Sequence, residues 1–154
     1  MECKIFYKPI TTQIEFDNWL RCMDISINHF LQRFEQDLQL YLTYQIESLP
    51  LVEDWLIAQY KAKDIYNPEN IPLFDRVGRF IGEIFRKYFG GNWYVDLDDN
   101  EHLFYQWAGI IRSYTPNQLY PIYPHAWVTT SIDRRTGKFI TQRFEQYFNK
   151  DIKD

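Results

Sequence analysis

The strongest constraint on the fold is the run from Val77 to Trp93, because its apolar spacing, its glycine stop and the pattern after it agree. Its large apolar residues recur at spacings of three and four, which places them along one side of a helix. Gly90 and Gly91 supply the left-handed residue that commonly ends a helix. From Trp93 onward apolar and polar residues alternate, as in a half-buried strand. The sequence therefore predicts a helix that ends at this glycine pair and leads into a strand.

Gly78 and Gly82 lie one turn apart on the same face of this predicted helix. Each costs about 1 kcal/mol of helix stability relative to alanine, so we expect a compensating gain from packing. Without side chains at these positions, another backbone or a large aromatic ring can approach the helix closely. The pair therefore predicts a tight contact on this face.

Glu83 follows the glycine face and is the residue of this helix most open to a functional interpretation. Its carboxylate would suit a general base or a ligand for a partner's basic group. Arg79 and Lys87 each stand four positions away, a spacing that allows ordinary ion pairs on a helix surface. We favour the interpretation of Glu83 as a solvated or ion-paired helix residue.

The N-terminal half shows helical periodicity. Apolar residues from Phe16 to Ile46 keep helical spacing over many turns, which is long for one helix. Because good capping residues stand near position 25, we expect a short first element and then a helix over about 25–47. Pro50 should end that helix, because the residue before a proline disfavours helical geometry. A second helix is expected over about 51–61.

The C-terminal half predicts a small antiparallel sheet followed by helices. A hairpin with an acidic turn is expected over about 93–107, and 109–114 is a candidate third strand. Residues 114–124 are too rich in proline for a central strand and should form an extended loop. Residues 126–148 should be helical, with one break at a Thr-Gly pair. This order of elements belongs to the α+β class, and the length fits a single domain, residues 1–154.

Aromatic residues make up 19% of the chain, an unusually high share. Tyr and Trp contribute strongly to protein interfaces as well as to cores, so we expect part of this aromatic surface to serve binding. The net charge of −4 argues against nucleic acid as a partner, because nucleic-acid binders need Lys and Arg against the phosphates. A basic protein partner fits this charge better.

The N-terminus has no apolar run of the length that a signal peptide needs, and no stretch of about 18 apolar residues occurs. We therefore expect a cytoplasmic protein with no membrane partner. Cys3 and Cys22 are too few for a disulfide framework and match no zinc or redox spacing. Reduced thiols are expected.

The familiar catalytic and metal-binding motifs are missing from the sequence. No serine lies in a Gly-x-Ser-x-Gly elbow, and neither cysteine has a protease signature. The three histidines stand far apart along the chain. Asp96, Asp98 and Asn100 match the opening of a calcium loop, but Glu101 stands where that loop requires glycine. We therefore expect no catalytic residue, no metal and no cofactor.

The run 78–93 also carries a motif that resembles one in a family of small bacterial domains. Its elements are Gly78, Gly82-Glu83, Gly90-Gly91 and Trp93. Such domains are encoded beside polymorphic or contact-dependent toxins, as their immunity proteins. The segment 119–124 is similar to a proline-containing run that follows the sheet in those domains, and the resemblance covers about residues 73–127. It implies a small α+β fold and an immunity role, and it carries over no catalytic residue.

We therefore expect a cytoplasmic immunity protein that binds and neutralises a cognate toxin domain, such as a basic nuclease. Acidic residues of the hairpin turn would steer association, and aromatic residues near the prolines would anchor the partner. The expected partner-binding residues are Asp96, Asp98, Asp99, Glu101, Tyr114, Tyr120, Tyr123 and Trp127. One alternative is a small enzyme in which Glu83 works as an acid or base with His102 or His125. Another is a structural adaptor with a self-complementary apolar patch.

Overall fold

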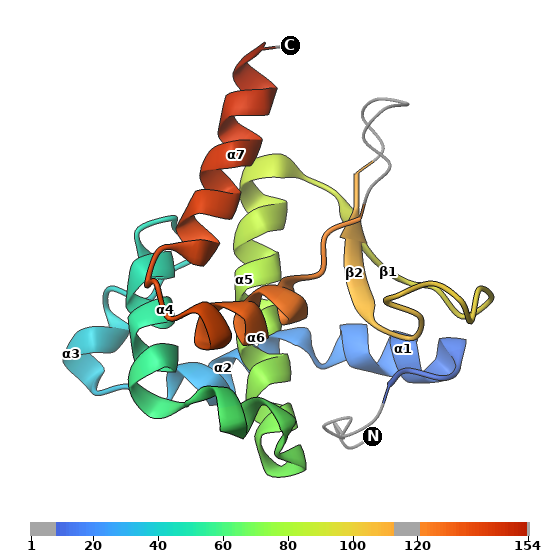
Figure 1. The fold of residues 1–154 in the computed structure, drawn as a ribbon, viewed down its shortest axis with the longest axis horizontal. Helices are drawn as coiled ribbons and strands as arrows, with labels where there is room; N and C mark the ends of the chain where they lie inside the picture. Colours follow the sequence, from blue (N-terminus) through green and yellow to red (C-terminus); the bar gives the residue numbers. More distant parts are fainter. Residues whose placement is uncertain (1–8, 113–120, 154) are drawn as a thin grey trace.

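The computed structural model describes residues 9–112 and 121–153, and it confirms the α+β class. Helices dominate, and a two-stranded antiparallel sheet lies to one side of them (Figure 1). In chain order the elements are α1 (Gln13–Arg21), α2 (Met23–Leu31), α3 (Gln36–Gln39), α4 (Ser48–Gln59), the 3₁₀ turns η1 (Ala62–Tyr66) and η2 (Pro68–Asn70), α5 (Ile71–Phe89), β1 (Asn92–Val95), β2 (Ala108–Ile111), α6 (Pro124–Arg134) and α7 (Phe139–Lys153).

Helix α5 runs through the middle of the molecule and packs against α2 and α6 (Figure 1). Its apolar stripe is buried, as the sequence predicts. The helix ends at Gly90 and Gly91, whose φ angles of 77° and 102° suit glycine. Arg86 Nε donates a hydrogen bond to the Gly91 carbonyl at 3.0 Å, which fixes the exit toward β1. The predicted helix and its strand are both confirmed.

Gly78 and Gly82 each make room for a ring. A Cβ atom placed on Gly78 would lie 2.6 Å from the imidazole of His125, and one on Gly82 would lie 2.3 Å from the indole of Trp93. Neither distance is possible for real atoms, so both positions require glycine in this packing. The expected tight contact on this face is confirmed.

The N-terminal half differs from the prediction, because the expected helix over 25–47 is broken. Helix α2 ends at Leu31, and a short α3 and turns fill the segment before α4. The Ser48 hydroxyl donates to the Thr43 carbonyl at 2.6 Å and accepts from the Thr43 amide at 2.9 Å, which stabilises these turns. Pro50 lies in the first turn of α4, where no backbone N–H is needed. The proline therefore accompanies a helix start rather than a helix end.

Strands β1 and β2 pair antiparallel, with Trp93 opposite Ile110 and Tyr94 opposite Gly109. The expected hairpin partner at 102–107 is a series of turns instead, and the second strand lies where a third was expected. Gln106 explains the shift: its φ is 67°, outside strand geometry, and its amide donates to the Asp96 carbonyl at 2.9 Å. Residues 96–107 thus form a long loop, here called the acidic loop.

The tail is helical with a break between α6 and α7, where Gly137 has a φ of 74°, as expected. Cys22 is disulfide-bonded, so the expectation of reduced thiols is wrong for this residue. Among residues 9–112 and 121–153, no helix combines the length and apolar character needed to cross a membrane.

Candidate functional site

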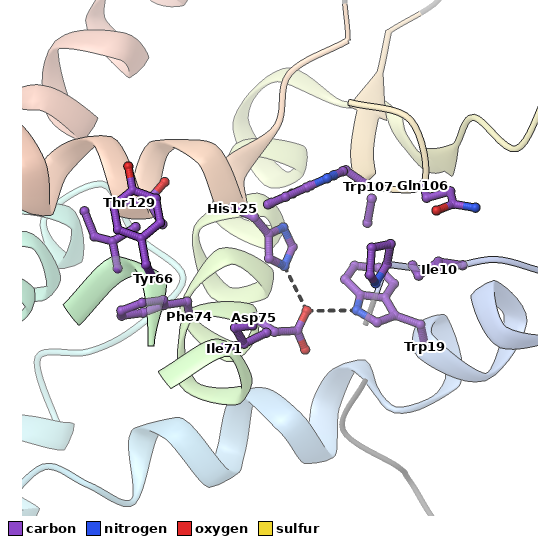
Figure 2. Close-up of a pocket in the computed structure, with 13 residues that line it drawn as sticks. Ile10, Trp19, Tyr66, Ile71, Phe74, Asp75, Gln106, Trp107, His125 and Thr129 are labelled. Atoms are coloured by element: carbon purple, nitrogen blue, oxygen red, sulfur yellow. Dashed lines mark hydrogen bonds and ion pairs between the residues drawn. The ribbon is translucent and has the colours of Figure 1, made fainter. Parts of the chain in front are cut away.

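The most elaborate polar cluster centres on Asp75, in the first half of α5. Its Oδ1 atom accepts a hydrogen bond from Trp19 Nε1 of α1 at 2.9 Å and lies 2.9 Å from His125 Nε2 of α6 (Figure 2). Its Oδ2 atom accepts from Arg79 Nε at 2.8 Å. One carboxylate therefore ties three helices together, and we call it the Asp75 hub.

The negative charge of Asp75 is paired with the buried guanidinium of Arg79. The Arg79 side chain is only 1% exposed, and besides its bond to Asp75 it donates to the Trp19 carbonyl at 2.7 Å. Its guanidinium also lies 4.1 Å from the centre of the Trp19 ring, within cation–π range. Burial by itself raises the pKa of Asp75. Hydrogen bonds and charge from His125 and Arg79 outweigh burial and lower the pKa from 3.8 to about 2.

The hub fixes the orientation of His125. Since the Asp75 carboxylate is ionised, His125 Nε2 carries the proton of their bond, and in a neutral ring Nδ1 is then the acceptor nitrogen. Nδ1 is buried and has no hydrogen-bond partner among the described residues. The Gly78 backbone lies against the ring. In this structure the Asp–His pair therefore holds a ring in place and presents no open nitrogen for proton transfer.

A cavity of about 490 Å³ opens beside the hub. Figure 2 shows its labelled residues in two groups, with Tyr66, Phe74 and Thr129 on one side of His125 and Ile10, Trp19 and Gln106 on the other. The lining is mostly apolar and consists of Pro9, Ile10, Trp19, Ile65, Tyr66, Ile71, Phe74, Asp75, Gln106, Trp107, Ala108, His125 and Thr129.

The acidic loop lies at the sheet side of the molecule, the side on which α1 also lies (Figure 1). Asp98, Asp99 and Glu101 are exposed on it, as expected for steering residues. Asp96 is half-buried, and its carboxylate accepts the backbone amides of Asp99 and Asp98 at 3.0 and 2.9 Å. These two bonds lower the pKa of Asp96. Asp96 therefore shapes the turn, and the other three carboxylates face solvent.

Two of the expected aromatic anchors, Tyr123 and Trp127, pack against other side chains of the protein. Tyr123 is 6% exposed, stacks on Phe104 with ring centres 4.0 Å apart, and has its hydroxyl 2.6 Å from that of Tyr94. Burial and this hydrogen bond raise the pKa of Tyr123. Trp127 is half-buried against Phe85 of the core. In this conformation most of the surface of both side chains is in contact with the protein itself, which leaves little of it for a partner.

Two further predicted anchors, Tyr114 and Tyr120, lie outside the described residues. The exposed apolar side chains of the acidic loop are instead Leu103 and Trp107, at 84% and 45% exposure. Sequence reasoning assigned Trp107 to a strand and missed both. The signal for them was the pair of large apolar residues directly after the acidic turn.

Glu83 is ion-paired, as favoured, but its partner is Arg86 at 2.8 Å. The hollow beside it is lined by Asp24, Tyr44 and Lys87 in addition to this pair, and by no histidine. The enzyme alternative placed Glu83 near His102 or His125; neither histidine lines this hollow, and the carboxylate hydrogen-bonded to His125 is that of Asp75. Within residues 9–112 and 121–153, no group of three His, Cys, Asp or Glu side chains is placed to hold a metal ion.

Comparison of the chain with protein-family models, with curated proteins and with solved structures found no match in any of the three.

Proposed function

We propose that this protein acts by binding, as an immunity protein that neutralises a cognate toxin domain with a basic surface. The observation that carries the proposal is the acidic loop, which presents three solvent-facing carboxylates beside two exposed apolar side chains. Net charge of the whole chain is −4, the same sign as the loop. The toxin-associated motif in the sequence supports the same role.

The loop combines two functions that a fast, stable inhibitor needs. Asp98, Asp99 and Glu101 attract a basic surface over a distance and raise the association rate. Trp107 and Leu103 then lose water against the partner, and buried aromatic residues at interfaces slow dissociation. The long 96–107 loop is anchored at its base by the bond between Gln106 and Asp96, so its tip is presented from a fixed position.

The proposed place of action is the cytoplasm, where an immunity protein meets a toxin inside its own cell. The disulfide-bonded Cys22 argues against this location, because disulfides are rare in the cytoplasm. Titration of free thiols in protein isolated under acid quench from the source cells tests this location. Reduced cysteines would support the cytoplasm, and oxidised cysteines would contradict it.

The experiment is co-expression with the toxin domain that the proposal places directly upstream in the source genome. The wild-type chain should restore growth. A triple variant, Asp98→Lys, Asp99→Lys and Glu101→Lys, should not restore it at matched expression. The matched control carries the same change of charge at exposed positions of α3, α6 and α7, namely Asp37→Lys, Asp133→Lys and Glu145→Lys, and should protect like wild type.

Two results overturn the proposal. One is an upstream reading frame without a growth-inhibiting domain, or one whose toxicity the wild-type chain leaves unchanged. The other is equal protection by the loop variant and the control variant, which would remove the acidic loop from the interface.

A further inference from the structure

The cavity beside the Asp75 hub has the size and lining of a ligand site, and the proposed function uses only Trp107 at its rim. Its volume of about 490 Å³ falls within the usual range for pockets that hold small molecules. Trp19, Phe74 and Trp107 supply aromatic walls on different sides. Such walls favour flat ring systems, because aromatic rings stack or meet edge to face.

Two aromatic side chains at the rim of the cavity are exposed to solvent. Tyr66 and Trp107 line the cavity and are 88% and 45% exposed, so both rings have free faces for a ligand. Exposed aromatic side chains at the edge of a mostly apolar cavity mark a binding site more often than a purely structural void.

Gln106 gives the rim a polar group in a special conformation. Its φ of 67° is uncommon for a residue with a side chain, and it is maintained because its amide donates to Asp96 and its carbonyl accepts from Ile10. Its side-chain amide makes no hydrogen bond to any described residue. Strained residues of this kind occur preferentially at ligand clamps and active sites.

The charges around the cavity select against anions. At the inner side of the cavity, the positive charge of Arg79 is paired with the Asp75 carboxylate. This arginine therefore does not offer its charge to an anionic ligand. The described residues that line the cavity include no lysine and no arginine, and Gln106 at the rim belongs to the acidic loop. We propose that this cavity binds a neutral or cationic ligand with a planar aromatic ring system.

The test is a titration with three indoles of nearly equal size, tryptamine, indole and indole-3-acetate, followed by ¹H–¹⁵N NMR of the tryptophan side chains. Tryptamine should shift the indole signals of Trp19 and Trp107, with a Kd on the order of 0.1–1 mM for so small a ligand. Indole-3-acetate should bind about fivefold more weakly than tryptamine, because of its charge.

Two variants locate the site. Thr129→Trp places a large side chain in the cavity, since Thr129 lines it and its hydroxyl bonds only within its own helix. Trp107→Ala removes an exposed wall. Each should weaken tryptamine binding about tenfold or more. Tyr41→Ala removes another exposed aromatic side chain, outside the cavity, and should leave binding unchanged.

Absence of shifts at Trp19 and Trp107 with 5 mM tryptamine overturns the proposal, where ~5 mM exceeds the expected Kd several times. Equal binding by wild type and by a folded Thr129→Trp variant overturns it as well. Neither result bears on toxin neutralisation, because the first uses the wild-type chain and Thr129→Trp leaves the acidic loop unchanged. Trp107→Ala also removes a proposed toxin anchor, so it serves here only to measure tryptamine binding.

Discussion

Replacing Asp75 with asparagine should destabilise the protein strongly at neutral pH. The substitution keeps the size of the side chain and removes its charge, which leaves the Arg79 guanidinium without its carboxylate at a position that is 1% exposed. Breaking a buried ion pair from one side typically costs about 3–5 kcal/mol. We expect a loss of this size in the free energy of unfolding at pH 7.

The same carboxylate predicts how the loss depends on pH. The folded-state pKa of about 2 lies below the ordinary 3.8, so the charge of Asp75 stabilises the fold above about pH 4. This contribution is lost as pH falls from about 4 to 2. At about 1.4 kcal/mol per pH unit, the difference amounts to about 2 kcal/mol. The gap between wild type and Asp75→Asn should therefore narrow by about 2 kcal/mol between pH 5 and pH 2.

Urea unfolding followed by tryptophan fluorescence and circular dichroism at pH 7, 5, 3 and 2 measures this gap. Other carboxylates titrate in both proteins, so the difference isolates Asp75. Asp37→Asn, at an exposed position of α3, serves as the control and should match wild type throughout. A gap below about 1 kcal/mol at pH 7 would show that the Asp75–Arg79 pair contributes little to stability. A gap that stays constant between pH 5 and pH 2 would contradict the lowered pKa of Asp75.

Three further substitutions test local parts of the structure by urea unfolding. Gly82→Ala should cost about 1–3 kcal/mol, because its Cβ would meet the Trp93 ring; an unchanged midpoint would show that the ring moves freely. Gln106→Gly should stabilise the fold by roughly 1 kcal/mol, because glycine adopts the positive φ of this position without strain, and it should weaken tryptamine binding. A destabilised variant would show that Gln106 is not strained in the folded protein. Arg135→Ala should cost about 1–3 kcal/mol, because its guanidinium donates to two carbonyls at the end of α4 at 2.7 and 2.8 Å; a neutral effect would show that water replaces these bonds.

Local signals explain what could be predicted from the sequence. Helix α5 and its end at Gly90 depend on residues within a few turns of one another, so the sequence predicts both correctly. Pro50 was misplaced because a proline near a polar residue is compatible with a helix end and with a helix start. The second strand was misplaced because Gln106, with no glycine to mark it, adopts a left-handed conformation.

The Asp75 hub depends on contacts that no local pattern reveals. Trp19 and His125 lie 56 and 50 positions from Asp75 in the sequence, so only the packing of α1 and α6 on α5 brings them together. The one local signal was Arg79, four positions after Asp75 on the same helix. The acidic character of the loop could be predicted from composition, whereas the exposure of Trp107 required the strand register.

Stopped-flow association rates at rising salt measure whether the acidic loop steers binding to a basic toxin domain. For wild type and for the charge-matched control, the rate should fall roughly tenfold or more between about 50 and 500 mM NaCl. The Asp98, Asp99 and Glu101 charge reversal should start at a low rate and depend little on salt. Equal rates and equal salt dependence in the loop variant and the control would contradict the account.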